Sequence, residues 1–365
     1  MNDWKKVKLG EIIEFNPTER LSKGTLAKKI AMEKIEPFTR DIPEFELLEY
    51  KGGTKFRNGD TLMARITPSL ENGKTAKVSL LDKDAVGFGS TEFIVARARK
   101  GISDENFIYY LMLSLNVRDV AIKSMVGTSG RQRVQLDVVK NYEVLCPPLS
   151  EQIQIGKILS VIDDKIENNK KINHHLEQIG TIIWQERFNN QVPNGVLGDI
   201  ASISSGKRPP IKTTEPTDDV KIPIIGASSI MGYTDKILYN HKILVTGRVG
   251  THGIIQRYQR SCWPSDNTLV LQSDFYEFVY QVLKHIDFKT LNRGSTQPLI
   301  TQTDLNKSEL YIPSISELLD FETVVGTHMK QYEQNNLENE ILFALRDTLL
   351  PKLLSGEISV NQTAK

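Results

Sequence analysis

The sequence of 365 residues has few of the features that mark membrane, secreted or metal-binding proteins. Its two cysteines, Cys146 and Cys262, lie far apart and outside any Cys-x-x-Cys pair, which argues against a disulfide framework and a cysteine-rich zinc site. No run of about 18 uncharged apolar residues occurs, so we expect no membrane-spanning helix. Residues 1–15 lack the apolar core of a signal peptide. These absences predict a soluble cytoplasmic protein with no membrane partner.

The sequence also lacks a large excess of either charge, since its formal net charge is only +1. The charge is unevenly distributed: residues 1–150 and 196–315 carry a small excess of Lys and Arg, whereas residues 151–195 and 316–365 carry an excess of Asp and Glu. This asymmetry is compatible with a polyanionic partner, although a solvated surface of mixed charge is the commoner cause. The length predicts two or three domains.

The sequence contains an internal repeat. "VKLGEIIEFNP" (7–17) matches "GVLGDIASISS" (195–205), and residues 124–152 match residues 291–318. The segments 124–152 and 291–318 both contain Gly followed by Thr or Ser, then a Gln, a predicted short strand and a proline. A predicted long helix follows each of them. Between these matches, alternating runs such as "TEFIVARA" and short apolar helices predict an α+β fold with two β-rich domains.

Two long helices follow the β-rich parts, and their apolar residues recur with a period of 3.5. The repeating positions of the first helix are Ile155, Leu159, Ile162, Ile166, Asn169, Asn173, Leu176, Gly180 and Ile183. Those of the second helix are Phe321, Val325, His328, Tyr332, Asn335, Asn339, Leu342, Arg346 and Leu349. This period is typical of a coiled coil. The alternative is two separate amphipathic helices, each lying on its own domain.

Asparagines interrupt both apolar stripes at matching places. The connectivity makes a paired arrangement antiparallel, and one register then places Asn169 opposite Asn339 and Asn173 opposite Asn335. A slipped register would leave these amides against Leu or Ile, so a buried Asn fixes the register at a cost in stability. A rod of this length would separate two related domains by about 50–60 Å. Two domains held at a fixed separation suit duplex DNA as a target, because its major groove returns to the same face every ~34 Å.

The order of these motifs resembles the specificity subunit of type I restriction–modification systems. The resemblance covers residues 4–358 and includes "ITPSLENGKTAKV", "GSTEFIV", "GSTQPLITQTDL" and the ending "LLPKLLSGEI". It implies a non-catalytic chain with two target-recognition domains, each reading one half of a bipartite double-stranded DNA target. It further implies that the paired helices set the unread spacer and dock two methyltransferase subunits, which restriction subunits join in some assemblies.

The resemblance also implies the organisation of the chain and its cofactors. The expected segments are a first target-recognition domain (1–150), a first coiled-coil helix (151–190), a second target-recognition domain (191–315), a second coiled-coil helix (316–358) and a tail (359–365). No cofactor is expected in this chain, whereas the partner subunits would use S-adenosylmethionine, ATP and Mg.

Candidate DNA contacts are basic residues in glycine-containing loops, because Arg reads guanine bidentately and Lys binds phosphate. The candidates are Arg65, Lys74, Lys77, Arg131, Arg133, Lys207, Arg208, Arg248, Arg293 and Gln297. For any one of them, ordinary surface solvation is the competing explanation. The repeated Gly-Thr/Ser-x-Gln element has a structural alternative, in which it holds the loop before the final strand of each domain.

The sequence contains several partial matches to catalytic motifs, and each lacks residues or elements that the motif requires. "FNPT" (15–18) lacks the second proline and the aromatic residue of an amino-methyltransferase motif, and "VGFGS" (86–90) is followed by no helix. His174 and His175 are adjacent on a helix and cannot chelate one metal as an i, i+4 pair does. The sequence therefore favours a DNA-recognition subunit. The alternative is a coiled-coil scaffold whose β-rich domains bind proteins or glycans.

Overall fold

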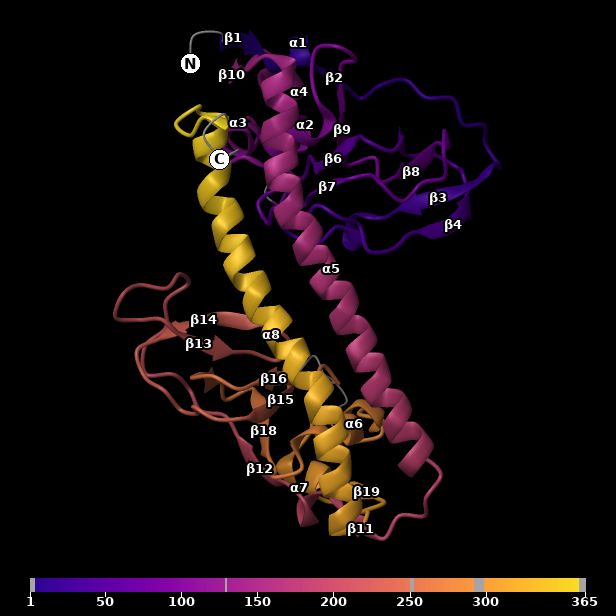
Figure 1. Cartoon of the computed structure of the whole chain (residues 1–365), viewed down its shortest axis with the longest axis vertical. Coiled ribbons are helices and arrows are strands. Elements are labelled where there is room, and N and C mark those ends of the chain that lie inside the picture. Colours follow the sequence, from indigo (N-terminus) through magenta and orange to yellow (C-terminus); the bar gives the residue numbers. More distant parts are fainter. Residues whose placement is uncertain (1–3, 129, 250–252, 292–298, 361–365) are drawn as a thin grey trace. The chain divides into compact units, whose positions relative to one another are not determined.

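The computed structural model describes residues 4–128, 130–249, 253–291 and 299–360 (Figure 1). Internal contacts divide the chain into two compact units: a first unit of residues 1–170 with 336–365, and a second unit of residues 171–335. The division crosses both long helices, so each unit combines one β-rich domain with part of each helix. Within the described residues, no helix is long and apolar enough to cross a membrane.

The first unit is β-rich with a few short helices. Its elements are β1 (Lys5–Lys8), α1 (Leu9–Ile12), β2 (Ile13–Phe15), β3 (Leu26–Ile30), β4 (Glu46–Glu49), β5 (Thr54–Phe56), β6 (Thr61–Ala64), β7 (Thr75–Lys77), β8 (Gly87–Gly89), β9 (Phe93–Ala98), α2 (Glu105–Leu113), α3 (Leu115–Lys123), α4 (Leu136–Asn141) and β10 (Glu143–Cys146). The strands form sheets in the orders β2-β9-β6-β7 and β4-β3-β8-β5, and β1 pairs with β10.

The second unit repeats this plan. Its elements are β11 (Gly195–Val196), β12 (Ser202–Ser205), β13 (Ile222–Ile225), β14 (Ile230–Thr234), β15 (Ile243–Gly247), β16 (Gln256–Tyr258), β17 (Trp263–Pro264), β18 (Thr268–Gln272), α6 (Tyr276–His285), α7 (Gln302–Asn306) and β19 (Glu309–Leu310). The sheets have the orders β12-β18-β15-β16 and β14-β13-β17, and β11 pairs with β19.

The two units share more than strand order. In the second sheet of each unit one pair is parallel, β3 with β8 in the first unit and β13 with β17 in the second, among otherwise antiparallel pairs. The central strands β6 and β15 are buried along their whole length, as expected for strands covered on both faces. The predicted α+β fold with an internal repeat is therefore confirmed.

Two helices of 40 residues each, α5 (Leu149–Phe188) and α8 (Ile315–Leu354), follow the β-rich parts (Figure 1). In the first unit, Asn169 Nδ2 donates to Asn339 Oδ1 at 2.9 Å. In the second unit, Asn335 Nδ2 donates to Asn173 Oδ1 at 2.8 Å. All four side chains are buried. In each unit the helices therefore pack against each other, and the alternative of two helices without mutual contact is excluded.

An ion pair in the first unit shows the direction of the helices independently. Arg346 Nη1 of α8 lies 3.1 Å from Asp163 Oδ1 of α5, and the two side chains are only 1% and 4% exposed. Asp163 lies before Asn169 on α5, whereas its partner Arg346 lies after Asn339 on α8, so the segments are antiparallel. The Tyr110 hydroxyl of α2 donates to Asp163 Oδ2 at 2.6 Å, which ties the helix pair to the β-rich part of the unit.

The Asp163–Arg346 pair makes a testable contribution to stability. Replacing Asp163 by Ala removes the buried carboxylate beside the Arg346 guanidinium and leaves only the exposed Asp347 as its charged partner. We expect the free energy of unfolding to fall by about 3 kcal/mol. Urea unfolding followed by circular dichroism measures this loss. The exposed pair Lys123–Asp119 is the matched control, because Asp119→Ala should cost no more than about 1 kcal/mol. Equal losses in the two variants would contradict the buried contribution.

Candidate nucleic-acid interface

Arg65 and Arg248 occupy equivalent places in the two units. Arg65 follows β6, the backbone N–H of Arg65 donates to the Glu92 carbonyl, and the Arg65 carbonyl accepts from the backbone N–H of Val134, both at 2.9 Å. The first of these contacts places Arg65 beside the residue that precedes β9, and the second places it beside the loop that leads to α4.

Arg248 repeats these contacts in the second unit. It follows β15, its backbone N–H donates to the Asn267 carbonyl at 3.0 Å, and its carbonyl accepts from the backbone N–H of Ile300 at 2.9 Å. Asn267 precedes β18, the counterpart of β9. The duplicated framework therefore presents one arginine at the same backbone position in each unit, a match that the sequence indicated only weakly.

In the first unit, Arg65 and Arg133 converge on one carboxylate. Arg133 Nη2 donates to Glu92 Oε1 at 2.7 Å, and Arg133 Nε lies 3.1 and 3.0 Å from the two carboxylate oxygens. Arg65 Nε lies 3.8 Å from Glu92 Oε2. The Arg133 hydrogen bond lowers the pKa of Glu92 from its usual value. The sequence analysis missed Glu92, whose only signal was an acid directly before a buried strand.

Neutral polar groups surround Arg248 in the second unit. Its Nη1 donates to Ser205 Oγ at 3.3 Å, and Gln302 Nε2 donates to the same oxygen at 2.8 Å. Gln302 starts α7, so this contact ties the end of β12 to α7. Ser205 and Gln302 were also missed by the sequence analysis, because neither residue type signals a contact by itself.

Lys207 and Arg208 extend the same surface beyond β12, and both are exposed. The intervening Gly206 approaches the backbone so closely that an added Cβ would lie 2.2 Å from the Ser265 carbonyl oxygen. Only glycine fits this approach without a backbone shift. The glycine thus brings the exposed basic pair over β17, where Lys207 N–H donates to the Pro264 carbonyl at 2.9 Å.

The remaining candidates have different environments. Lys74 Nζ donates to the Met32 carbonyl at 2.9 Å, and Lys77 Nζ lies 2.7 Å from Glu105 Oε1, so both ammonium groups already hold parts of the first domain together. Arg131 is exposed in the loop before Arg133. Arg293 and Gln297 lie outside the described residues.

In the second unit, a buried arginine attaches the sheet β12-β18-β15-β16 to α6 and α8. The Arg257 guanidinium of β16 binds both carboxylate oxygens of Glu277 on α6, at 2.6 and 2.9 Å, and its Nε lies 3.2 Å from Glu333 of α8. The side chain of Arg257 is 5% exposed, and the rings of Tyr276 and Tyr280 lie within 4.9 Å of its guanidinium carbon. The sequence analysis did not predict this cluster.

Arg40 has a similar role in the first unit. Its Nη2 lies 2.6 Å from Asp164 Oδ1, and its Nη1 donates to the Ser160 carbonyl at 3.2 Å, both on α5. In each unit, therefore, one arginine of the β-rich domain binds the adjoining long helix. This arrangement limits rotation of each β-rich domain relative to that helix.

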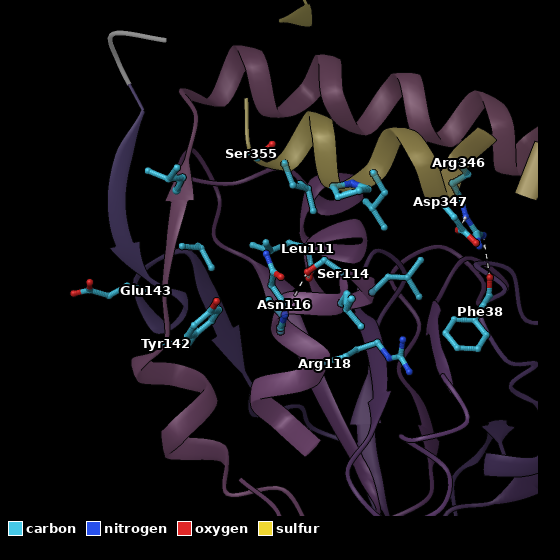
Figure 2. A pocket seen from close by; sticks show the side chains of 18 residues that line it. Phe38, Leu111, Ser114, Asn116, Arg118, Tyr142, Glu143, Arg346, Asp347 and Ser355 are labelled. Atoms are coloured by element: carbon cyan, nitrogen blue, oxygen red, sulfur yellow. Dashed lines mark hydrogen bonds and ion pairs between the residues drawn. The ribbon is translucent and has the colours of Figure 1, made fainter. Parts of the chain in front are cut away.

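Each unit also has a groove beside the last turns of a long helix. The groove of the first unit has a volume of about 500 Å³ and is lined mainly by the end of α2, the start of α3, β10 and the end of α8. Figure 2 shows Leu111, Ser114, Tyr142 and Ser355 around it. The groove of the second unit, about 420 Å³, is lined by the corresponding elements, namely the end of α5, the end of α6 and β19.

The cysteines and acidic clusters offer little for catalysis. Burial raises the pKa of Cys146, and it raises the pKa of Cys262 to about 12, so both side chains remain neutral thiols at physiological pH. In the part of the chain that the structure describes, no group of three or more His, Cys, Asp or Glu side chains is arranged to hold a metal ion.

Comparisons with known proteins identify the fold. The Haemophilus influenzae HindI specificity subunit of a type I restriction enzyme is 23% identical over 98% of this chain and 100% of its own length. The MjaIX specificity subunit from Methanocaldococcus jannaschii is 23% identical over 72% of this chain and 71% of its own length. The crystal structure of a type I restriction–modification S subunit from M. genitalium covers 96% of both chains at 17% identity with a TM-score of 0.56, which shows a shared fold.

A protein-family match covers most of the chain. The family described as type I restriction modification DNA specificity domain matches residues 1–178 and 192–347, and thus nearly the whole of both repeats. These matches agree with the duplicated β-rich domains and the paired helices. The chain therefore belongs to this family, and it is the DNA specificity subunit of a type I restriction–modification system.

Proposed function

We propose that each β-rich domain reads one half of a bipartite DNA target through an arginine at a repeated position. The observation that supports this most strongly is the equivalence of Arg65 and Arg248, each following the buried central strand of its sheet and held by matching backbone contacts. An arginine fork donates to guanine O6 and N7 in the major groove and distinguishes guanine from the other bases. Different loops around equivalent arginines allow the two domains to read different sequences.

The other basic residues serve the phosphate backbone in this proposal. Exposed Arg131, Lys207 and Arg208 reach phosphates without breaking internal bonds. Lys74 and Lys77 would first have to exchange the bonds that hold them within the first domain. Phosphate contacts position the protein but carry no sequence information. Arg293 and Gln297 remain predicted contacts of the second domain.

The paired helices act as the spacer ruler between the two half-sites. At about 1.5 Å per residue, a helix of 40 residues is about 60 Å long, which suits two domains that act on separate turns of one duplex. The asparagine contacts fix the register of α5 against α8, because a slipped pairing would bury an unsatisfied amide. In this proposal the recognition domains span residues 1–150 and 191–315, and the segments 151–190 and 316–358 form the ruler.

Two methyltransferase subunits dock on the helical part, and restriction subunits join them in the restricting assembly. A groove formed by corresponding elements occurs in both units, and this correspondence supports two copies of a single partner. Apolar side chains exposed on the helices add to this surface: Ile153, Val161, Ile182, Leu319, Ile341 and Leu345. In this proposal the partners supply catalysis and bind S-adenosylmethionine, ATP and Mg.

The bipartite reading predicts asymmetric effects of substitution. Arg65→Ala should relax only the half-site read by the first domain, and Arg248→Ala only the other, at a cost of about 1–3 kcal/mol for each lost bidentate contact. Methylation profiling of a host that expresses each variant with its methyltransferase partner gives the recognised sequence directly.

Arg187→Ala, an exposed arginine of α5 that pairs with Asp320, is the control for loss of a surface charge. It should leave both half-sites unchanged. Equal relaxation of both half-sites by either loop variant would count against independent reading by the two domains.

The docking proposal predicts a change in stoichiometry. Leu115 lines the groove of the first unit and is 69% exposed, so Leu115→Asp should leave the fold intact while placing a charge in the groove. Native mass spectrometry with the methyltransferase subunit should then show one bound copy in place of two. Leu26→Asp, at a 59% exposed position of β3, should retain both copies. Two copies on the Leu115 variant would refute docking at this groove.

A further inference from the structure

The backbone frameworks that hold Arg65 and Arg248 differ at one position, where the first unit has a charged side chain and the second a neutral one. Glu92 and Asn267 hold equivalent positions, since each precedes the strand beside the central strand and accepts the backbone N–H of the repeated arginine. Only the first domain therefore has a carboxylate at this point. This carboxylate contacts Arg133 and Arg65, the two candidate readers of that domain.

The contact with Arg133 uses one side of its guanidinium. Glu92 binds Nε and Nη2, which is a side-on arrangement. The described residues offer no hydrogen-bond partner to Nη1 of Arg133, so the end-on fork of Nη1 and Nη2 keeps donors for a ligand. A bidentate carboxylate fixes the plane of a guanidinium, and a fixed plane is what bidentate recognition of a base requires.

The exposed fractions of the Arg133, Arg65 and Glu92 side chains are consistent with a surface that contacts DNA. Arg133 is 44% exposed, Arg65 is 37% exposed and Glu92 is 23% exposed, so both arginines are accessible and the acid is less exposed than either. A residue that only stabilised the core would be expected to lie deeper, as Asp163 does. The position of Glu92 between the two arginines also lowers the net positive charge that the first domain offers to any duplex.

We propose that Glu92 is a positioning residue that sets the sequence discrimination of the first recognition domain by holding the Arg133 fork in one orientation beside Arg65. This inference rests on the proposed function of the two arginine loops. Glu92 acts in two ways: it aligns Arg133 for the cognate base, and its charge opposes attraction to phosphates of any sequence. Both effects raise the ratio of cognate to non-cognate binding.

The variant Glu92→Gln tests the proposal in the complete assembly. Methylation profiling should show that sites altered by one base in the first half-site gain methylation relative to cognate sites, by about fivefold or more. Discrimination in the second half-site should stay as in the wild type, which also shows that the variant has folded and assembled. Arg133→Lys, which keeps the charge but loses the planar fork, should relax the same half-site.

Glu14→Gln, which removes an exposed acid of β2 and alters the net charge equally, is the matched control. It should leave the discrimination of both half-sites unchanged. The proposal is overturned if Glu92→Gln relaxes neither half-site, if it relaxes both alike, or if Arg133→Lys leaves the first half-site intact. Failure of the bipartite function itself would appear differently, as equal relaxation of both half-sites by Arg65→Ala or by Arg248→Ala.

Discussion

The buried polar contacts between α5 and α8 are the constraint on which the architecture depends. Asn169 with Asn339, Asn173 with Asn335, and Asp163 with Arg346 place hydrogen-bonding groups where an apolar seam would otherwise run. Apolar seams tolerate a shift of one heptad, because Leu and Ile pack against one another in several registers. Buried amides and charges do not, since each shift leaves a group without its partner.

A second set of polar contacts attaches the β-rich domains to the helices. Arg40 binds α5 in the first unit, and Arg257 binds α6 and α8 in the second, so each β-rich domain is attached to a long helix by charge as well as by packing. The loops that carry Arg65 and Arg248 then differ on a common backbone framework. At one repeated position the first domain has Glu92 where the second has Asn267, so the two arginine surfaces differ in charge at a point where their backbone contacts match.

The sequence predicted the features that depend on local periodicity or on repetition. The 3.5-residue period marked both long helices, and the repeated motifs around the strands marked the two β-rich domains. It did not predict Glu92, Asp163 or Arg257 as partners of other residues, because these contacts join segments that are distant in sequence and have no periodic signal. Lys77 illustrates the converse: its position beside a turn suggested a phosphate contact, whereas its ammonium group binds Glu105 and Asn106 within the domain.

Cysteine cross-linking of the helix register tests the central claim most directly. Lys165 and Glu338 form an ion pair at 3.0 Å beside the asparagines, and a linker that reacts with two thiols can span the length of these two side chains, which a direct disulfide cannot be assumed to do. A short linker of this kind should therefore join cysteines at these two positions, whereas it should not join cysteines at 165 and 345, one heptad away. If the six polar seam residues are replaced by Leu, with Met in place of Arg346, the account predicts that the second cross-link also forms. An unchanged pattern, with only the 165–338 cross-link in both backgrounds, would contradict the claim that these polar contacts hold the register.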